Sequence, residues 1–236
     1  MVKWQLMSAR ITLFPEKPGN RTAAQIYRDL WSEDPESFQS GQANVFGQAS
    51  NASGKRGAST FTVSAQPIRI DLNFTVIPEP ESRVQFLSAD EILPKLERLA
   101  ESVPLIPSRR IACYVQLGYA ASDTISANAA LSEAIDSRFR PKDLRDEEDF
   151  VLQVNSIADS KTLPEVKHNL LLKYSVEKLQ TITLPGPALV HEQIISMIHM
   201  DFNNKPVERA FDDSQLKKLV RELCELAVAR ARVYLG

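Results

Sequence analysis

Residues 68–76 read IRIDLNFTV, and this stretch decides the fold class. Apolar side chains occupy every second position, and Arg, Asp, Asn and Thr lie between them. Strict alternation of this kind is typical of a β-strand with one face on the core and one face toward solvent. Such half-buried strands are the mark of antiparallel sheets, so the stretch predicts an antiparallel sheet.

The segment just before it, residues 61–65, also alternates, but in the opposite phase. The phase changes at Gln66-Pro67. A type I′ hairpin there needs positive φ at both central residues, which proline cannot adopt. A β-bulge inside one long strand accommodates both the phase change and the proline. We therefore favour a bulge at Gln66-Pro67 over a two-residue hairpin.

The rest of the chain supplies further strands and four helices. The patterns predict strands over residues 4–14, 109–118, 150–156, 169–183 and 193–203. They predict helices after Thr22 and Ser88, each with the spacing of a capping box, and over residues 122–135 and 212–235.

Residues 38–59 are rich in Gln, Asn, Ser, Gly and Ala, which predicts a long, mobile polar loop. The chain as a whole is expected to form a single α+β domain over residues 1–236. It would hold a strongly curved, mostly antiparallel sheet of about six long strands with four helices. The C-terminal helix is expected to pack on the concave face of that sheet.

A register can be predicted for the last hairpin by matching apolar with apolar residues. This places Leu172 opposite Phe202 and Tyr174 opposite Met200. On the other face of the sheet, Lys173 then lies opposite Asp201 and Ser175 opposite His199, so that opposite charges meet.

Composition excludes several classes of function. The 236 residues carry a formal net charge of −2, with 43% hydrophobic and 25% charged residues, which is typical of a globular protein and not of a basic nucleic-acid binder. No apolar run is long enough to span a membrane or to form a signal peptide. Cys113 and Cys224 lie in apolar segments and are expected to be buried and reduced, which favours the cytoplasm.

The candidate metal site consists of His199 and Asp201, which share one face of one predicted strand. Two ligands two residues apart can chelate a metal ion, and a histidine beside a carboxylate can act as a base. The alternative is a structural cluster in which Asp201 pairs with Lys173 across the strands. We favour the structural cluster, and no cofactor is indicated.

Asp149 followed by Glu165-Val166-Lys167 resembles the acidic and Glu-x-Lys arrangement of restriction-type nucleases. The resemblance implies a divalent metal ion held between two carboxylates. However, an antiparallel hairpin puts Asp149 and Glu165 at opposite ends, separated by roughly 25 Å. A shared metal ion is therefore not expected.

Two basic pairs, Lys55-Arg56 and Arg109-Arg110, are candidate contacts for an acidic partner. Since the sequence offers no phosphate loop and no credible catalytic set, we expect a non-catalytic protein-interaction or assembly subunit. A protein partner or self-association follows from this hypothesis. The alternatives are a binder of a small apolar ligand between the curved sheet and the C-terminal helix, and a metal-dependent hydrolase or nuclease.

Overall fold

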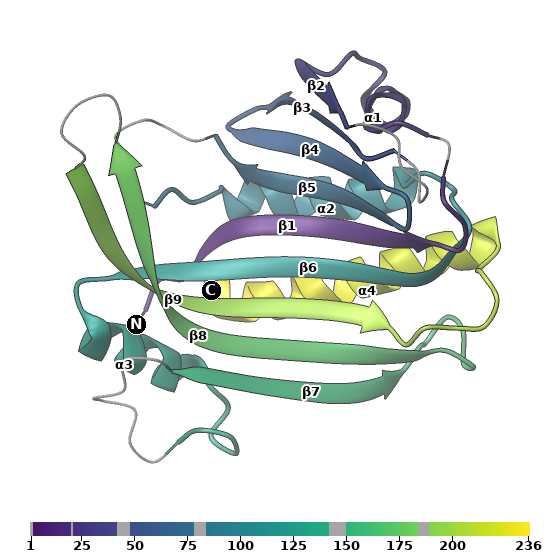
Figure 1. Ribbon diagram of the computed structural model, residues 1–236. Coiled ribbons are helices and arrows are strands. Elements are labelled where there is room, and N and C mark those ends of the chain that lie inside the picture. Colours follow the sequence, from purple (N-terminus) through teal and green to yellow (C-terminus); the bar gives the residue numbers. More distant parts are fainter. Residues whose placement is uncertain (1, 20, 42–47, 78–83, 142–149, 184–188) are drawn as a thin grey trace.

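The computed structural model describes residues 2–19, 21–41, 48–77, 84–141, 150–183 and 189–236. Within them, nine strands form one antiparallel sheet in the order β2-β3-β4-β5-β1-β6-β9-β8-β7 (Figure 1). The strands are β1 Gln5–Pro15, β2 Ser37–Ser40, β3 Ser50–Arg56, β4 Ser59–Gln66, β5 Arg69–Val76, β6 Ser108–Ala121, β7 Val151–Asp159, β8 Lys167–Thr183 and β9 Leu189–Asn204. The helices are α1 Ala23–Trp31, α2 Ala89–Ser102, α3 Thr124–Ala134 and α4 Asp213–Leu235.

The α+β class, the antiparallel sheet and the packing of the C-terminal helix on it are confirmed, but the expected strand number and curvature are wrong. Two of the extra strands, β2 and β3, fall almost entirely in residues 38–59, which were expected to form a loop; only Ser37 of β2 lies before this range. Small polar residues form these strands because β3 pairs with β2 on one side and with β4 on the other. The third extra strand comes from the division of residues 61–76 into β4 and β5.

The predicted bulge at Gln66-Pro67 is also wrong, because these residues belong to a hairpin. Gln66 pairs with Arg69, which leaves Pro67 and Ile68 as a two-residue turn. Among the described residues other than glycine, only Ser32 has a positive φ, so this turn is not of type I′. A turn with negative φ at both central residues accepts proline at the first of them. The prediction failed because it considered only the type I′ turn.

Local sequence signals set the helix ends. Capping boxes begin α1 at Thr22 and α4 at Asp212, as the side-chain hydrogen bonds show. Ser88 is the N-cap of α2, but its side chain makes no capping bond. Glu91, the other half of the expected box, instead accepts a hydrogen bond from Lys95 one turn later.

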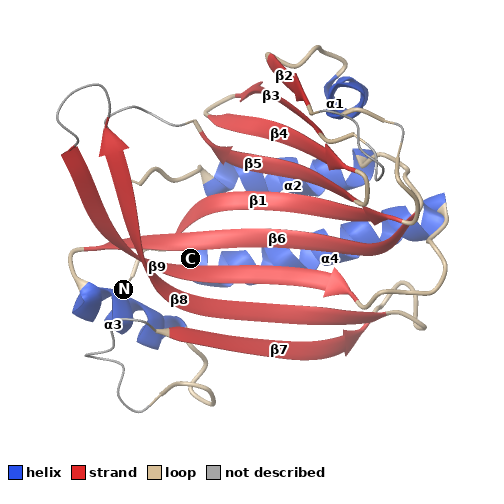
Figure 2. Ribbon diagram, in the orientation of Figure 1, coloured by secondary structure: helices blue, strands red, loops and turns tan. Residues whose placement is uncertain are grey.

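All four helices lie on one face of the sheet. Phe61 on β4 contacts α1 through Tyr27 and Trp31, Cys113 on β6 contacts α4, and Ser196 on β9 donates a hydrogen bond to the carbonyl of Ala127 in α3. The pairing register puts these contact residues on the same face. Figure 2 shows α2 and α4 lying along this face, behind the strands. No described helix covers the opposite face.

Side chains fill the interface between α4 and the sheet. The inner face of α4 consists of Leu216, Leu219, Val220, Leu223, Cys224, Ala227, Val228 and Ala231, all buried. Both cysteines are free and buried, as expected. The hydrogen bond between Cys113 and Cys224, together with burial, raises the pKa of the Cys224 thiol. The helix packs directly on β6, where the sequence-based alternative places a small apolar ligand.

The β8–β9 hairpin is confirmed, but its register differs from the predicted one. Leu170, and not Leu172, lies opposite Phe202, so Lys173 lies opposite His199. The difference of two residues keeps every side chain on the predicted face, because side chains alternate with a period of two. Apolar matching thus identified the buried face but not the partner of each residue.

Candidate functional site

The predicted metal-site residues lie on the uncovered face of the sheet, near its centre. His199 on β9 is flanked by Tyr114 on β6 and by β8. The Tyr114 hydroxyl lies 2.6 Å from His199 Nδ1, and the Ser175 hydroxyl lies 3.3 Å from Nε2. Glu177 Oε1 is 3.6 Å from the same Nε2. Three neighbouring strands therefore hold this imidazole in place.

The electrostatics of this cluster favour a neutral histidine. Burial, followed by the nearby positive charge of Lys173, lowers the pKa of His199. Burial raises the pKa of Tyr114 to about 12, so its phenol stays protonated at neutral pH. The phenol can then donate to Nδ1, and the proton on Nε2 faces Ser175 and Glu177. The imidazole has a partner on each nitrogen.

Asp201 does not join His199 in a ligand set. Its carboxylate accepts a hydrogen bond of 3.0 Å from the Asn203 side chain on the same strand. Within the described ranges, no group of three or more His, Cys, Asp and Glu side chains could hold a metal ion. The predicted ion pair with Lys173 is replaced by a 3.9 Å contact between Lys173 and Glu177.

The polar groups of this face extend the cluster toward β1 and β5. Asp71 accepts a 2.6 Å hydrogen bond from Thr12 and a 2.8 Å bond from Arg69. The Arg10 guanidinium lies 3.6 Å from Asp71 and 4.8 Å from the centre of the Tyr114 ring. These groups contact one another across neighbouring strands, as charged and polar side chains on one face of a sheet do, although Arg10 Nε makes no hydrogen bond within the described residues.

The four predicted binding cations are not brought together. Lys55 and Arg56 end β3, whereas Arg109 and Arg110 begin β6, and β4, β5 and β1 lie between these strands. Arg56 stacks on Trp31 at 4.6 Å and pairs with Glu33 at 2.8 Å.

The second basic pair also has intramolecular partners. Arg109 pairs with Glu16 at 2.6 Å, and the Arg110 guanidinium lies 5.1 Å from the centre of the Phe14 ring. Three of the four cations therefore have a role inside the fold, and only Lys55 extends from the surface without a side-chain partner among the described residues.

The nuclease-like motif is only partly within the described residues. Asp149 lies outside the described residues. Val151, two residues later, lies opposite Ser175, while Lys167 lies opposite Asp159 at the other end of the hairpin. Lys167 forms a 2.9 Å ion pair with Asp159. The motif residues that the structure describes thus lie at the far end of the hairpin from the start of β7.

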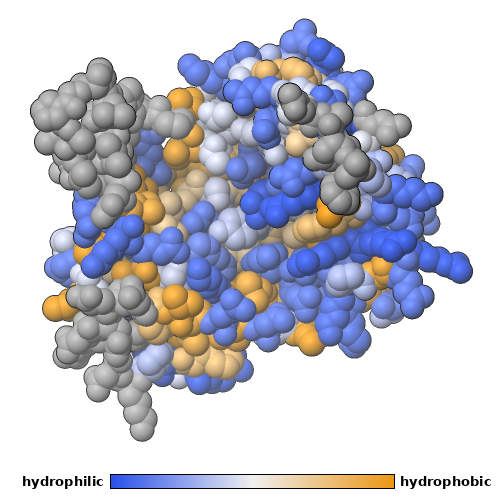
Figure 3. All heavy atoms as spheres, viewed as in Figure 1, coloured by the Kyte–Doolittle hydropathy of each residue, from blue (hydrophilic) through white to orange (hydrophobic). Residues whose placement is uncertain are grey.

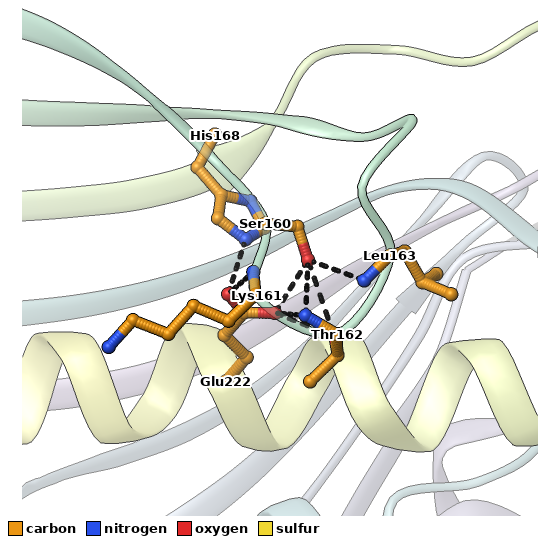
Figure 4. Close-up of polar contacts among 6 residues, drawn as sticks. All are labelled: Ser160, Lys161, Thr162, Leu163, His168 and Glu222. Atoms are coloured by element: carbon orange, nitrogen blue, oxygen red, sulfur yellow. Dashed lines mark hydrogen bonds and ion pairs between the residues drawn. The ribbon is translucent and has the colours of Figure 1, made fainter.

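Sequence reasoning missed a buried carboxylate, Glu222 on α4 (Figure 4). Only 6% of this residue is exposed. Its carboxylate accepts hydrogen bonds of 2.6 Å from the Ser160 hydroxyl, the Lys161 amide and the Thr162 hydroxyl, and one of 3.3 Å from the Thr162 amide. His168 Nε2 is 3.3 Å from the same group. Glu222 thereby fastens the β7–β8 turn to α4.

The chemistry of this buried cluster is structural. Burial by itself raises the pKa of Glu222, but the hydrogen bonds from Ser160 and Thr162 outweigh it and lower that pKa to about 2. Ser160 donates to the carboxylate and not to His168, so no base activates its hydroxyl. Ser160 and His168 are buried, whereas Glu222 also lines a surface cavity together with Lys161 and Thr162. The sequence signal was a charged residue beside Leu219 and Leu223 on the apolar face of the helix.

The outer strand β7 differs from the polar centre of the sheet. It pairs with β8 on one side and ends the sheet on the other. Val151 and Ile157 of this strand are 60% and 57% exposed. Figure 3 shows hydrophilic residues over the centre of the uncovered face and hydrophobic ones gathered toward its lower part, on the side of β7. At this edge, exposed apolar side chains and backbone that no other described strand pairs with coincide over nine residues, whereas the β2 edge offers four residues with the exposed Phe38.

Comparisons with protein-family models, with curated proteins and with solved structures found no match to this chain. None of the described helices is both long and apolar enough to cross a membrane.

Proposed function

We propose that this chain is a non-catalytic interaction or assembly subunit that binds protein by strand addition at the outer edge of β7. The observation that carries the proposal is the character of this edge. It runs for nine residues, from Val151 to Asp159, and no other described strand pairs with it. An unpaired edge of this kind is a template for another strand, because it offers a row of free N–H and C=O groups.

The devices that normally protect an edge strand are missing from β7. Such strands are usually short, interrupted by proline or a bulge, or marked by lysine. β7 contains neither proline nor lysine, and its pairing with β8 continues without a register shift. Its first eight residues, from Val151 to Ala158, carry no charge. A strand with these properties favours pairing with a β-strand of another protein chain.

The polar clusters around His199 and Glu222 also support a non-catalytic role. His199 and Glu222 are the residues whose surroundings most resemble a reactive site. Each has its polar atoms occupied by neighbouring side chains or turn amides. An interaction role explains why β7 exposes apolar residues at its edge. A catalytic role at either cluster does not explain this.

A proline substitution in β7 tests the proposal. Gln153→Pro removes one outward N–H group, while proline is tolerated at an edge where the N–H faces solvent. The matched control, Gln153→Thr, keeps the amide and favours a strand. Tagged wild-type and variant chains would be used to capture protein from cells that contain the chain, with untagged copies of the chain counted among the captured proteins.

We expect at least one captured protein to be retained by wild type and Gln153→Thr and reduced more than tenfold by Gln153→Pro. Binding would then be repeated with the two purified proteins. Circular dichroism would show that both variants are folded. Equal capture by all three chains, after this check, would contradict strand addition at β7.

A further inference from the structure

We infer that the strand added to β7 is the β7 strand of a second copy of this chain, antiparallel to the first, with Val154 on a two-fold axis. This inference rests on the proposed function, since it names the partner of the same edge. Three observations carry it: the direction of the free backbone groups, the pattern of the side chains and the charge of the strand.

Hydrogen bonds at the two ends of the hairpin fix the direction of the backbone. The carbonyl of Phe150 accepts a bond of 3.1 Å from the amide of Val176, and the amide of Ser160 donates a bond of 2.9 Å to the carbonyl of Val166. Even-numbered residues therefore direct their N–H and C=O groups toward β8, because these directions alternate along a regular strand. Odd-numbered residues from Val151 to Asp159 direct theirs to the free edge.

The side-chain pattern of β7 is complementary to itself about Val154. With this residue on the axis, Val151 lies opposite Ile157 of the second copy, and Ile157 lies opposite its Val151. Gln153 and Asn155 pair in the same way. The two-fold axis thus produces the Val151–Ile157 pair two times, so that both exposed apolar residues of each copy lie opposite an apolar residue. The side-chain amides of Gln153 and Asn155 likewise lie opposite each other. Moving the axis to Asn155 would instead place Val151 opposite Asp159.

The charge of the strand also fits a copy of itself. Asp159 is its only charged residue, and that carboxylate already pairs with Lys167 at 2.9 Å. An edge built for an unlike, charged partner would carry complementary charges, because such charges select the partner. A nearly uncharged strand causes no repulsion when it meets itself.

The two-fold arrangement also closes the assembly. Pairing of β7 with β7 uses the same edge on both copies and leaves β2 at each end of a continuous sheet. The alternative, β7 against β2, would repeat without end and would match only the four residues of β2. The four residues of β2 are too few to pair with all the outward N–H and C=O groups of β7. The symmetric β7–β7 pair leaves fewer of these groups without a partner.

Oxidative cross-linking tests the register. Residue 154 lies where the two β7 strands exchange no hydrogen bonds, so the two Cα atoms are expected about 4.5 Å apart. This is within the range of roughly 4.4–6.8 Å that a disulfide needs. Val154→Cys should therefore form a covalent dimer. In the matched control, Ser156→Cys, the two copies of the residue would be about 13 Å apart along the strands.

The measurements are native mass and the rate of dimer formation under mild oxidation, with wild type as the control for the buried Cys113 and Cys224. We expect wild type at twice its 26.4 kDa chain mass, and cross-linking of Val154→Cys at least tenfold faster than that of Ser156→Cys. A wild-type chain that stays monomeric at a concentration of about 100 µM, or faster cross-linking of Ser156→Cys than of Val154→Cys, would overturn the inference. If Gln153→Pro still abolished binding of a different protein, the proposed function would stand without it.

Discussion

The two edges of the sheet are built in opposite ways. β2 is a four-residue strand in which every residue is exposed, and its sequence, SFQS, is mostly polar. β7 is more than twice as long and exposes Val151 and Ile157 on the uncovered face. A short polar edge offers little to another strand, whereas a long, nearly uncharged one offers a complete template. This difference is the basis for the proposal that β7, and not β2, pairs with a further strand.

The anchoring of the two edges differs as well. The turn after β7 is fastened to α4 by the buried Glu222 carboxylate. Near β2, the contacts include the exposed 3.1 Å bond from the Lys55 amide to Glu36 and a buried 2.9 Å bond from the Ala23 amide to Ser50, which lies opposite Ser40 of β2. A firmly held edge loses less conformational entropy when a partner strand binds, so anchoring by Glu222 prepares β7 for pairing.

The largest effect is expected from Glu222→Ala, which removes the anchor of the β7 side. It leaves two turn amides and two hydroxyls without their buried acceptor and removes the carboxylate that lies 3.3 Å from His168. The free energy of unfolding should therefore fall by about 4 kcal/mol. Urea denaturation would measure this. Glu225→Ala, an exposed position on the same helix, should change stability by about 0.5 kcal/mol or less. Similar losses for the two variants would show that Glu222 does not anchor the turn.

The same carboxylate predicts a dependence on pH. The pKa of Glu222 is lowered from its ordinary value of 4.5 to about 2 in the folded chain. Its contribution is therefore complete above pH 4.5 and is lost as the pH falls through about 2. Compared with Glu222→Gln, wild type should be more stable by about 2 kcal/mol at pH 7, and this gap should close between those two values. A gap that stays constant from pH 7 to pH 2 would contradict the assignment.

An intermediate effect is expected from a charge on the β7 edge. Ile157→Lys removes two apolar cross-strand contacts from the symmetric pair and introduces two lysines, as natural edge strands do. Association should weaken about tenfold, while the unfolding free energy of the monomer changes by about 0.5 kcal/mol or less. Sedimentation at several concentrations would measure the first value. Unchanged association would mean that Ile157 lies outside the interface.

The smallest effect is expected at the β2 edge. Phe38 is 47% exposed and lies in the short strand, so Phe38→Lys should leave the native mass unchanged and alter stability by about 0.5 kcal/mol or less. Native mass and urea denaturation would check this against Ile157→Lys. If Phe38→Lys reduced association more than Ile157→Lys, the roles assigned to the two edges would be reversed.

The sequence predicted those parts of the fold in which a periodic pattern decides the structure. The strands that became β1, β5, β6, β7, β8 and β9 and all four helices follow from alternation, helical spacing or caps. β2 and β3 escaped prediction because small polar residues form a strand only when neighbouring strands supply the pairing. The register of the β8–β9 hairpin escaped because apolar matching fixes the face and not the partner. The Ser156→Cys control would detect a register displaced in this way in the β7–β7 pair, because Val154→Cys would then no longer cross-link faster than that variant.

The candidate site was less predictable than the fold. His199 was recognised as part of a polar cluster, but its closest partner, Tyr114, comes from a strand far away in the sequence. Glu222 was overlooked because its donors lie in the β7–β8 turn about 60 residues earlier. Long-range pairing decides both environments, and no local pattern encodes it.

Amide hydrogen exchange in β7, followed residue by residue by NMR, tests the use of this edge. The amides of Leu152 and Val154 point to β8 and should exchange slowly at every protein concentration. Those of Gln153, Asn155 and Ile157 point outward and should become protected as the concentration rises. Outward amides that exchange rapidly at all concentrations, while the inward ones remain protected, would contradict pairing of β7 with a second copy.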